Sequence, residues 1–284
     1  SNNTAVGYSA LTANTTGTQN TFIGSQAGDA NTTASYSTAV GYDALGANTT
    51  GERNAAFGRT SLAANTTGVY NVAVGMSALY SNTTASQNTA VGYEALFANT
   101  TGAFNTALGR LAGASNTTAS RNTFVGQSAG TTNTTGTSNV ALGDNALLLN
   151  TTASNNTAIG KNALSANTTG ANNVAVGSLT LDAATTGASN TAVGQGAMTT
   201  TTTGGYNAAV GAGALNDNTT GANNIAMGYL ALRRNTTAAN NTAVGYAALT
   251  ANTTGTGNSA VGRSALGSNT TGSGNAAFGA YYAG

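Results

Sequence analysis

The sequence predicts an all-β protein, a parallel β-solenoid (β-roll) of seventeen 17-residue coils. The core N-x-A-V-G returns every 17 residues from Asn3 to Asn275, and Gly fills the fifth place of every coil, from Gly7 to Gly279. Thr, Gly and Asn, which dominate the unit, are weak helix formers, and no apolar period of about 3.6 residues survives inside it. A fixed period of this kind is typical of stacked repeats, here with one coil per repeat.

The repeat covers the whole chain, so we expect one solenoid domain over residues 1–284, with coils starting at 3, 20, 37 and every 17 residues to 275. We expect this domain to form part of a longer chain or fibre. Charged residues make up only 5 % of the sequence and the net charge is +1, without a basic cluster, which argues against nucleic-acid binding. Cys is absent, which excludes disulfides and thiolate metal sites, and no run approaches the roughly 18 apolar residues of a membrane span.

Each place in the coil, numbered from its first Asn, has a recognisable role. Place four is always a larger apolar residue, such as Val6 or Phe278, and is predicted to be buried. Places eight and nine are mostly Ala-Leu, as in Ala10-Leu11, and predict a second apolar stripe. All fifteen charged residues and most Tyr fall at places six, seven, ten, eleven, sixteen or seventeen, which we expect to face water. Gly at place five predicts a corner that a Cβ would obstruct.

Two coils exchange a large residue for a small one. Place three is Ala except at Phe22 and Phe124, and place nine of the same coils is Gly28 and Gly130 in place of Leu. Gly113 lacks a Phe in its own coil, but Phe124 follows in the next. This compensation predicts that places three and nine meet inside one layer, although these coils being related copies would also explain it.

The alternation of side chains along a strand leaves two orientations open. If place three points inward, places two and four point outward; if place four points inward, Ala at place three lies outside. In both cases one strand is apolar on both faces, which predicts lateral self-association into a trimer or filament. A bend that turns two adjacent side chains inward is the alternative.

The sequence Asn-Thr-Thr recurs at one corner of the coil, and it has two interpretations. It is formally an acceptor for N-glycosylation. It also fits a ladder of stacked Asn amides and Thr hydroxyls, which is favoured because both Thr persist where the Asn is replaced by Ala184 and Thr201. The glycosylation candidates are Asn14, Asn31, Asn48, Asn65, Asn82, Asn99, Asn116, Asn133, Asn150, Asn167, Asn218, Asn235, Asn252 and Asn269.

No catalytic constellation emerges from the sequence. His is absent and the seven carboxylates are scattered, with Asp29 and Asp43 on adjacent coils and Asp182 and Asp217 two coils apart. Solvated surface carboxylates are the favoured interpretation over a glycosidase pair. No Asp recurs at a fixed place, as a calcium-binding solenoid requires. We therefore expect neither an enzyme nor a cofactor, apart from covalent N-glycans on the second interpretation of Asn-Thr-Thr.

The motifs N-T-A-V-G, N-T-A-I-G (156–160) and N-S-A-V-G (258–262) resemble the head repeats of trimeric autotransporter adhesins. The chain is also similar to repeat shafts of phage tail fibres, although its coil is longer than that of the adhesin heads and carries the added Asn-Thr-Thr. The resemblance implies a β-roll, often trimeric, exposed at a cell surface or on a virion. Tyr282, at a place where Ala is usual, predicts a cap at the last coil.

We accordingly expect a non-enzymatic structural shaft of an extracellular filament, fibre or adhesin, located outside a cell, at its surface or on a virion. The alternative is a binding module, for glycan receptors through the outward Tyr and Arg or for ice through the Thr rows. Adjacent Thr on a strand face opposite ways, which speaks against a flat two-row ice-binding array.

Overall fold

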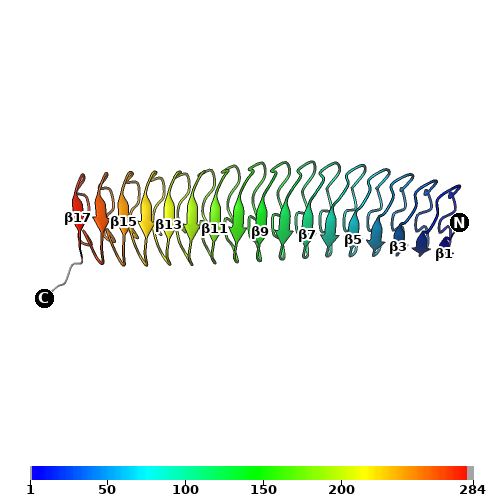
Figure 1. Cartoon of the computed structure of the whole chain (residues 1–284), viewed down its shortest axis with the longest axis horizontal. Coiled ribbons are helices and arrows are strands. Elements are labelled where there is room, and N and C mark those ends of the chain that lie inside the picture. The colour runs from blue at the N-terminus through cyan, green and yellow to red at the C-terminus, as the bar shows by residue number, and fades with distance from the viewer. Residues whose placement is uncertain (1, 280–284) are drawn as a thin grey trace. The chain divides into compact units, whose positions relative to one another are not determined.

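A computed structural model describes residues 2–279 and confirms the parallel β-solenoid with its 17-residue coil (Figure 1). The chain divides into two compact units, Ser1–Asn139 and Val140–Gly284. Within residues 2–279 every regular element is a three-residue strand, so no helix that could cross a membrane occurs there. Tyr282 lies outside the described residues.

The first unit is a stack of eight parallel strands. Consecutive strands pair with a register of 17 residues, so that Thr21 lies beside Thr38 and Ile23 beside Val40. Identical places of successive coils are therefore neighbours. The strands are β1 (Thr4–Val6), β2 (Thr21–Ile23), β3 (Thr38–Val40), β4 (Ala55–Phe57), β5 (Val72–Val74), β6 (Thr89–Val91), β7 (Thr106–Leu108) and β8 (Thr123–Val125).

The second unit has the same construction. Its strands also pair in parallel with a 17-residue register, as Val174 does with Thr191. They are β9 (Val140–Leu142), β10 (Thr157–Ile159), β11 (Val174–Val176), β12 (Thr191–Val193), β13 (Ala208–Val210), β14 (Ile225–Met227), β15 (Thr242–Val244), β16 (Ser259–Val261) and β17 (Ala276–Phe278).

The strand turns its middle residue inward, at place three. Phe22 and Phe124 and the Ala of this place in the other coils from β2 to β16 are fully buried. The prediction that place four is buried was wrong: Val6, Ile23 and Phe57 are 58 %, 40 % and 41 % exposed. Side chains alternate along a strand, so an inward place three sends places two and four outward. The interior is completed by Ala at place eight and Leu at place nine, as predicted.

The predicted contact between places three and nine is confirmed in the first unit. A Cβ built on Gly28 would lie 2.7 Å from Phe22 Cε1, and one on Gly130 would lie 2.4 Å from Phe124 Cδ1. Gly113 faces the same ring, with its built Cβ 2.6 Å from Phe124 Cδ2. The Phe ring therefore fills the volume that Leu fills in other coils, which keeps the interior close-packed.

The corner after the strand requires Gly. At place five φ lies between +126° and +140°. A Cβ on Gly41 would lie 2.4 Å from the carbonyl oxygen of Gly58 in the next coil. Both the backbone conformation and the close approach of successive coils exclude a side chain, so the corner predicted from the fixed Gly is confirmed.

Three further places adopt the left-handed conformation, which the sequence-based prediction missed. Asp43 at place seven, Leu45 at place nine and Arg53 at place seventeen have φ of 55°, 54° and 56°. For places seven and seventeen the sequence does contain a signal, because some coils carry Asn or Gly there, such as Asn162 and Gly257, and both residue types tolerate the left-handed conformation. Leu at place nine carries no such signal, and its burial must offset the backbone cost.

Candidate interaction face

The Asn of the Asn-Thr-Thr corner form a ladder inside the coil. The Nδ2 group of Asn48 donates to Asn31 Oδ1 at 3.0 Å and to the carbonyl oxygen of Gly51 at 3.0 Å. Asn65 repeats both bonds one coil later, to Asn48 Oδ1 at 2.8 Å and to Gly68 at 3.0 Å. Both hydrogens of the amide are therefore used, one between coils and one within the coil.

This placement bears directly on glycosylation. Twelve of the fourteen candidate Asn are fully buried, and Asn14 and Asn269 are half-buried. A sugar on Nδ2 replaces one amide hydrogen and needs open space, so it would break the ladder of a folded coil. Glycosylation at these residues stays a prediction, but it is one that the folded geometry opposes. The buried set is Asn31, Asn48, Asn65, Asn82, Asn99, Asn116, Asn133, Asn150, Asn167, Asn218, Asn235 and Asn252.

The ladder is interrupted where the sequence replaces Asn. Ala184 is fully buried and provides no amide, and Asn167 Oδ1 is a buried oxygen without a hydrogen-bond partner in the described residues. Two coils beyond Ala184, Asn218 Nδ2 keeps its bond to the carbonyl oxygen of Gly221 at 3.0 Å, but toward the preceding coil it reaches only Thr201 Oγ1, at 3.5 Å. A buried polar group without a hydrogen-bond partner destabilises the fold. In the uninterrupted coils the Asn of the next coil removes this cost by donating to the Oδ1 atom.

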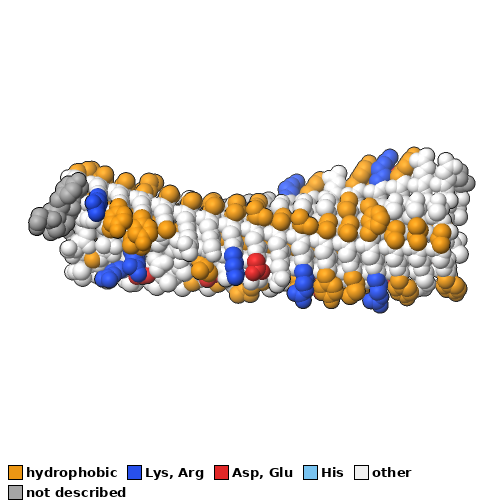
Figure 2. Space-filling model, turned by 90° about the horizontal axis from the view of Figure 1, so that it is seen from below, with side chains coloured by type: hydrophobic (Ala, Val, Ile, Leu, Met, Phe, Trp, Pro, Cys, Tyr) orange, Lys and Arg blue, Asp and Glu red, His pale blue; other side chains and the backbone are white. Residues whose placement is uncertain are grey.

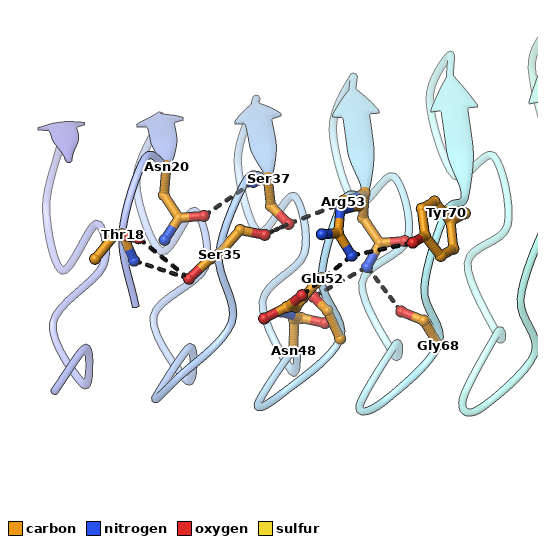
Figure 3. A network of polar contacts seen from close by, with 11 residues as sticks. Thr18, Asn20, Ser35, Ser37, Asn48, Glu52, Arg53, Gly68 and Tyr70 are labelled. Atoms are coloured by element: carbon orange, nitrogen blue, oxygen red, sulfur yellow. Dashed lines mark hydrogen bonds and ion pairs between the residues drawn. The ribbon is translucent and has the colours of Figure 1, made fainter. Parts of the chain in front are cut away.

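A second Asn ladder, at place one, was not predicted. Asn20 Oδ1 accepts from the backbone N–H of Ser37 at 2.9 Å, and its Nδ2 donates to the carbonyl oxygen of Ala34 at 2.8 Å. Ser37, the one exception to Asn at this place, keeps the ladder because its Oγ accepts from the N–H of Asn54 at 3.2 Å (Figure 3). The regular Asn at place one was the signal.

The two Thr of the corner have different roles. Thr49 Oγ1 at place thirteen donates to the carbonyl oxygen of Thr66 at 3.0 Å, and this bond recurs in both units. The Thr of place fourteen, such as Thr50, is exposed. The predicted Thr ladder therefore uses backbone acceptors, and each coil leaves one exposed Thr at this corner. One such row per corner does not favour ice binding.

The outer face of the strands carries a row of apolar side chains at place four in each unit, beside a row at place two in which Thr is the most frequent residue. We call the outward side chains of places two and four the strand face. In the first unit Val72 and Val74 are both 36 % exposed and Leu108 is 48 % exposed. In the second unit Leu142 and Met227 are 45 % and 44 % exposed. No charged residue occurs at these two places in any coil.

Stacked planar side chains border the strand face of the first unit along place seventeen. The guanidinium of Arg53 lies between the rings of Tyr36 and Tyr70, 5.2 Å and 5.4 Å from their centroids. Arg53 also donates to the hydroxyl of Tyr70 at 3.0 Å and to the carboxylate of Glu52 at 3.4 Å (Figure 3). Place seventeen lies two residues before the first residue of the strand, so this ladder runs beside the strand face.

The opposite border, at place six just after the Gly corner, repeats the arrangement. Figure 2 shows lines of hydrophobic side chains along this unit with Arg side chains at its margins. Glu94 accepts a hydrogen bond from the hydroxyl of Tyr93, and this bond raises the pKa of the Tyr93 hydroxyl. The cation–π pairs of the two borders, besides that of Arg53, are Arg59 on Tyr42 at 5.8 Å, Arg110 on Tyr93 at 5.9 Å and Arg121 on Phe104 at 5.8 Å.

The alternative function, a glycan-binding module, would use the outward aromatic rings as stacking surfaces for sugars. Several of these rings instead have one face covered by the neighbouring coil, as in the stacked pairs Tyr80–Phe97 at 5.2 Å and Tyr229–Tyr246 at 5.5 Å. A stacked ring presents its edge to solvent, which suits a hydrogen bond better than a sugar ring.

The seven carboxylates are spread over places six, seven, ten, eleven and sixteen of several coils. Partial burial and the charge of Asp29 raise the pKa of Asp43, while Arg59 opposes this shift. Asp182 accepts a hydrogen bond from Ser165. Among residues 2–279 no three His, Cys, Asp or Glu come together as a metal site would require.

Comparison with known proteins adds no relative. No protein-family model matches the chain, and no curated protein matches it.

Proposed function

We propose that the chain is a non-enzymatic structural shaft of an extracellular filament, fibre or adhesin, and that a second copy of the chain covers its strand face. The observation that carries the proposal is the strand face itself, which has an exposed or half-buried apolar side chain at place four of every coil of both units and no charged residue. An extended apolar surface of this kind is typical of a protein–protein interface.

The borders of the strand face support a protein partner. Tyr, Phe, Met and Arg are the residues enriched at interfaces, whereas Lys, Glu and Asp are depleted. Stacking on Tyr36 and Tyr70 holds Arg53 in place, so less side-chain entropy is lost when a partner binds. Self-association into a trimer or filament, which the resemblance to adhesin heads and tail-fibre shafts also implies, would bury the face along each unit.

The scattered carboxylates support the non-enzymatic role. Catalysis by general acids and bases needs groups that converge on one reacting atom. Asp43, at place seven, lies near Asp29 and Arg59, and Asp182, at place ten, accepts a hydrogen bond from Ser165; both Asp residues are half-buried.

The mass of the purified chain in solution tests the interface. We expect multi-angle light scattering to give a multiple of 27.5 kDa, and the double variant Val74→Lys, Val91→Lys to give 27.5 kDa. The matched control places the same two charges on exposed Thr of place fourteen, Thr67→Lys and Thr84→Lys, and should keep the wild-type mass. A monomeric wild-type chain, or equal masses for both variants, would contradict the proposal.

Two further measurements address the remaining parts of the proposal. Proteolytic peptides that contain the Asn-Thr-Thr corners, prepared from protein isolated from its source, should have the masses of the unmodified sequence if the Asn ladder is intact, and would exceed them if the corners carry glycans. Antibody labelling of intact source cells or virions should detect the chain without permeabilisation. Detection only after permeabilisation would refute an extracellular shaft.

A further inference from the structure

The second unit carries a groove of about 400 Å³ where the repeat departs from its usual composition. Its lining comes from places six, seven and ten of four successive coils. Place seven is Leu179 in the first of these coils and Leu230 in the last, but Gly196 and Gly213 in the two between them. The missing side chain at Gly196 opens the groove, whereas Leu230 Cδ2 lies over Gly213, 2.7 Å from where a Cβ would stand. The two leucines stand three coils apart, about 14 Å at the spacing of strands.

The floor of the groove is polar and ordered. Asn216 Nδ2 donates to the carbonyl oxygen of Gly196 at 2.8 Å and to Thr199 Oγ1 at 3.1 Å. Thr199 Oγ1 in turn donates to Gly196 at 2.9 Å. These bonds fix the amide so that its Oδ1 remains available as an acceptor, and the amide of Gln195 stands at the rim.

One end of the groove combines an aromatic face with a cation. Tyr246 covers one face of the Tyr229 ring, and coil thirteen carries only Ala212 at the same place, so the other face is turned toward the groove. Arg233 lines the same end, is exposed, and forms no ion pair within residues 2–279. This arrangement differs from the cation–π pairs of the chain, in which the guanidinium itself covers the ring of the neighbouring coil, as Arg263 covers Tyr246.

We propose that this groove binds a carboxylate-bearing saccharide of one to three sugar rings. The guanidinium of Arg233 matches a carboxylate in a bidentate hydrogen-bonded pair. The free face of Tyr229 and the side chain of Leu230 fit the apolar C–H face of a sugar ring, and Asn216 and Gln195 offer amides to its hydroxyls. The site is independent of the proposed shaft function, because it uses none of the strand-face residues of places two and four.

Equilibrium dialysis of the full chain against trigalacturonate tests the site, with the methyl ester of the same trisaccharide as the neutral probe. We expect saturable binding of one trigalacturonate per chain, and binding of the ester at least about tenfold weaker, because a hydrogen-bonded charge is lost. Arg233→Gln should weaken trigalacturonate binding by about tenfold or more for the same reason.

Two variants separate the groove from general effects. Arg234→Gln removes the same charge one place further along the coil, outside the groove, and should leave the affinity unchanged. Gly196→Leu should abolish binding and keep the fold, because place seven accepts Leu at a φ of 57° in Leu179, and a Cβ on Gly196 would meet nothing closer than 3.4 Å. Circular dichroism checks that fold.

Three results would overturn the site: no binding by the wild-type chain at millimolar trigalacturonate, equal losses in the two Arg variants, or full binding by Gly196→Leu. The Val74→Lys, Val91→Lys variant should bind trigalacturonate as the wild type does, so that a failure of the shaft interface and a failure of the groove are distinguishable.

Discussion

Substitution Ala184→Asn should stabilise the second unit, because it completes the interrupted ladder. Its amide would donate to Asn167 Oδ1, the buried acceptor that has no partner among the described residues, and to the carbonyl oxygen of Gly187. The two new bonds are worth about 1 kcal/mol each, and satisfying a buried oxygen removes a penalty of about 1–3 kcal/mol. Ordering the new side chain costs about 1 kcal/mol. We expect a net gain of about 2–4 kcal/mol on this balance.

Hydrogen exchange of backbone amides in residues 165–190, followed by mass spectrometry, measures this gain locally, which suits a chain whose coils contact only their neighbours. Exchange should slow by about tenfold for each 1.4 kcal/mol. The control is the same substitution in an Asn167→Ala background, where most of the gain should disappear. Unchanged or faster exchange in Ala184→Asn would refute the view that the amide ladder stabilises the coil.

The other predictions concern the interior, the corner and the surface. Phe22→Ala should lower the free energy of unfolding by about 3–5 kcal/mol, and Gly28→Leu should lower it by about 1–3 kcal/mol. The double variant should lie within about 1.5 kcal/mol of the wild type, because Ala and Leu are the pair that other coils carry. Chemical denaturation measures all three, and additive losses in the double variant would contradict the contact between places three and nine. Gly41→Ala should lower the free energy of unfolding by about 3 kcal/mol. Gly257→Ala should lower it by only about 1 kcal/mol, because Gly257 has a φ of +66° and nothing lies within 4 Å of its built Cβ. Equal shifts of the melting temperature in the two variants would contradict the requirement for Gly at place five. Partial burial raises the pKa of Asp43, so the contribution of its protonation to stability is complete below the unfolded pKa and is lost as pH rises through the folded pKa. Asp43→Asn should therefore raise the melting temperature at pH 7 and leave it unchanged at pH 3. An equal rise at both pH values would contradict a raised pKa of Asp43 as the cause.

The fold was predictable because the period constrains every coil alike. Phe22 and Gly28 even revealed which places meet, since a change of volume at one is compensated at the other. The orientation of the strand was misjudged at place four, because Val and Ile suit an exposed strand surface as well as an interior. The groove at Gly196 could not be predicted, since it depends on which side chains of four coils stand beside one another.

The ladder formed by the Asn of the Asn-Thr-Thr corner, at place twelve of the coil, also gives each unit a direction. Asn82 donates to Asn65, and Asn99 donates to Asn82, so successive side-chain dipoles point the same way along the stack. Hydrogen bonds in such a chain polarise one another, so an inner amide holds its neighbours more strongly than an isolated pair would. The ladder is consequently a one-way chain, and its interruption at Ala184 and Thr201 has two unequal sides. Before it, Asn167 Oδ1 is an acceptor without a donor; after it, Asn218 Nδ2 has only a long bond to Thr201 Oγ1 in the preceding coil.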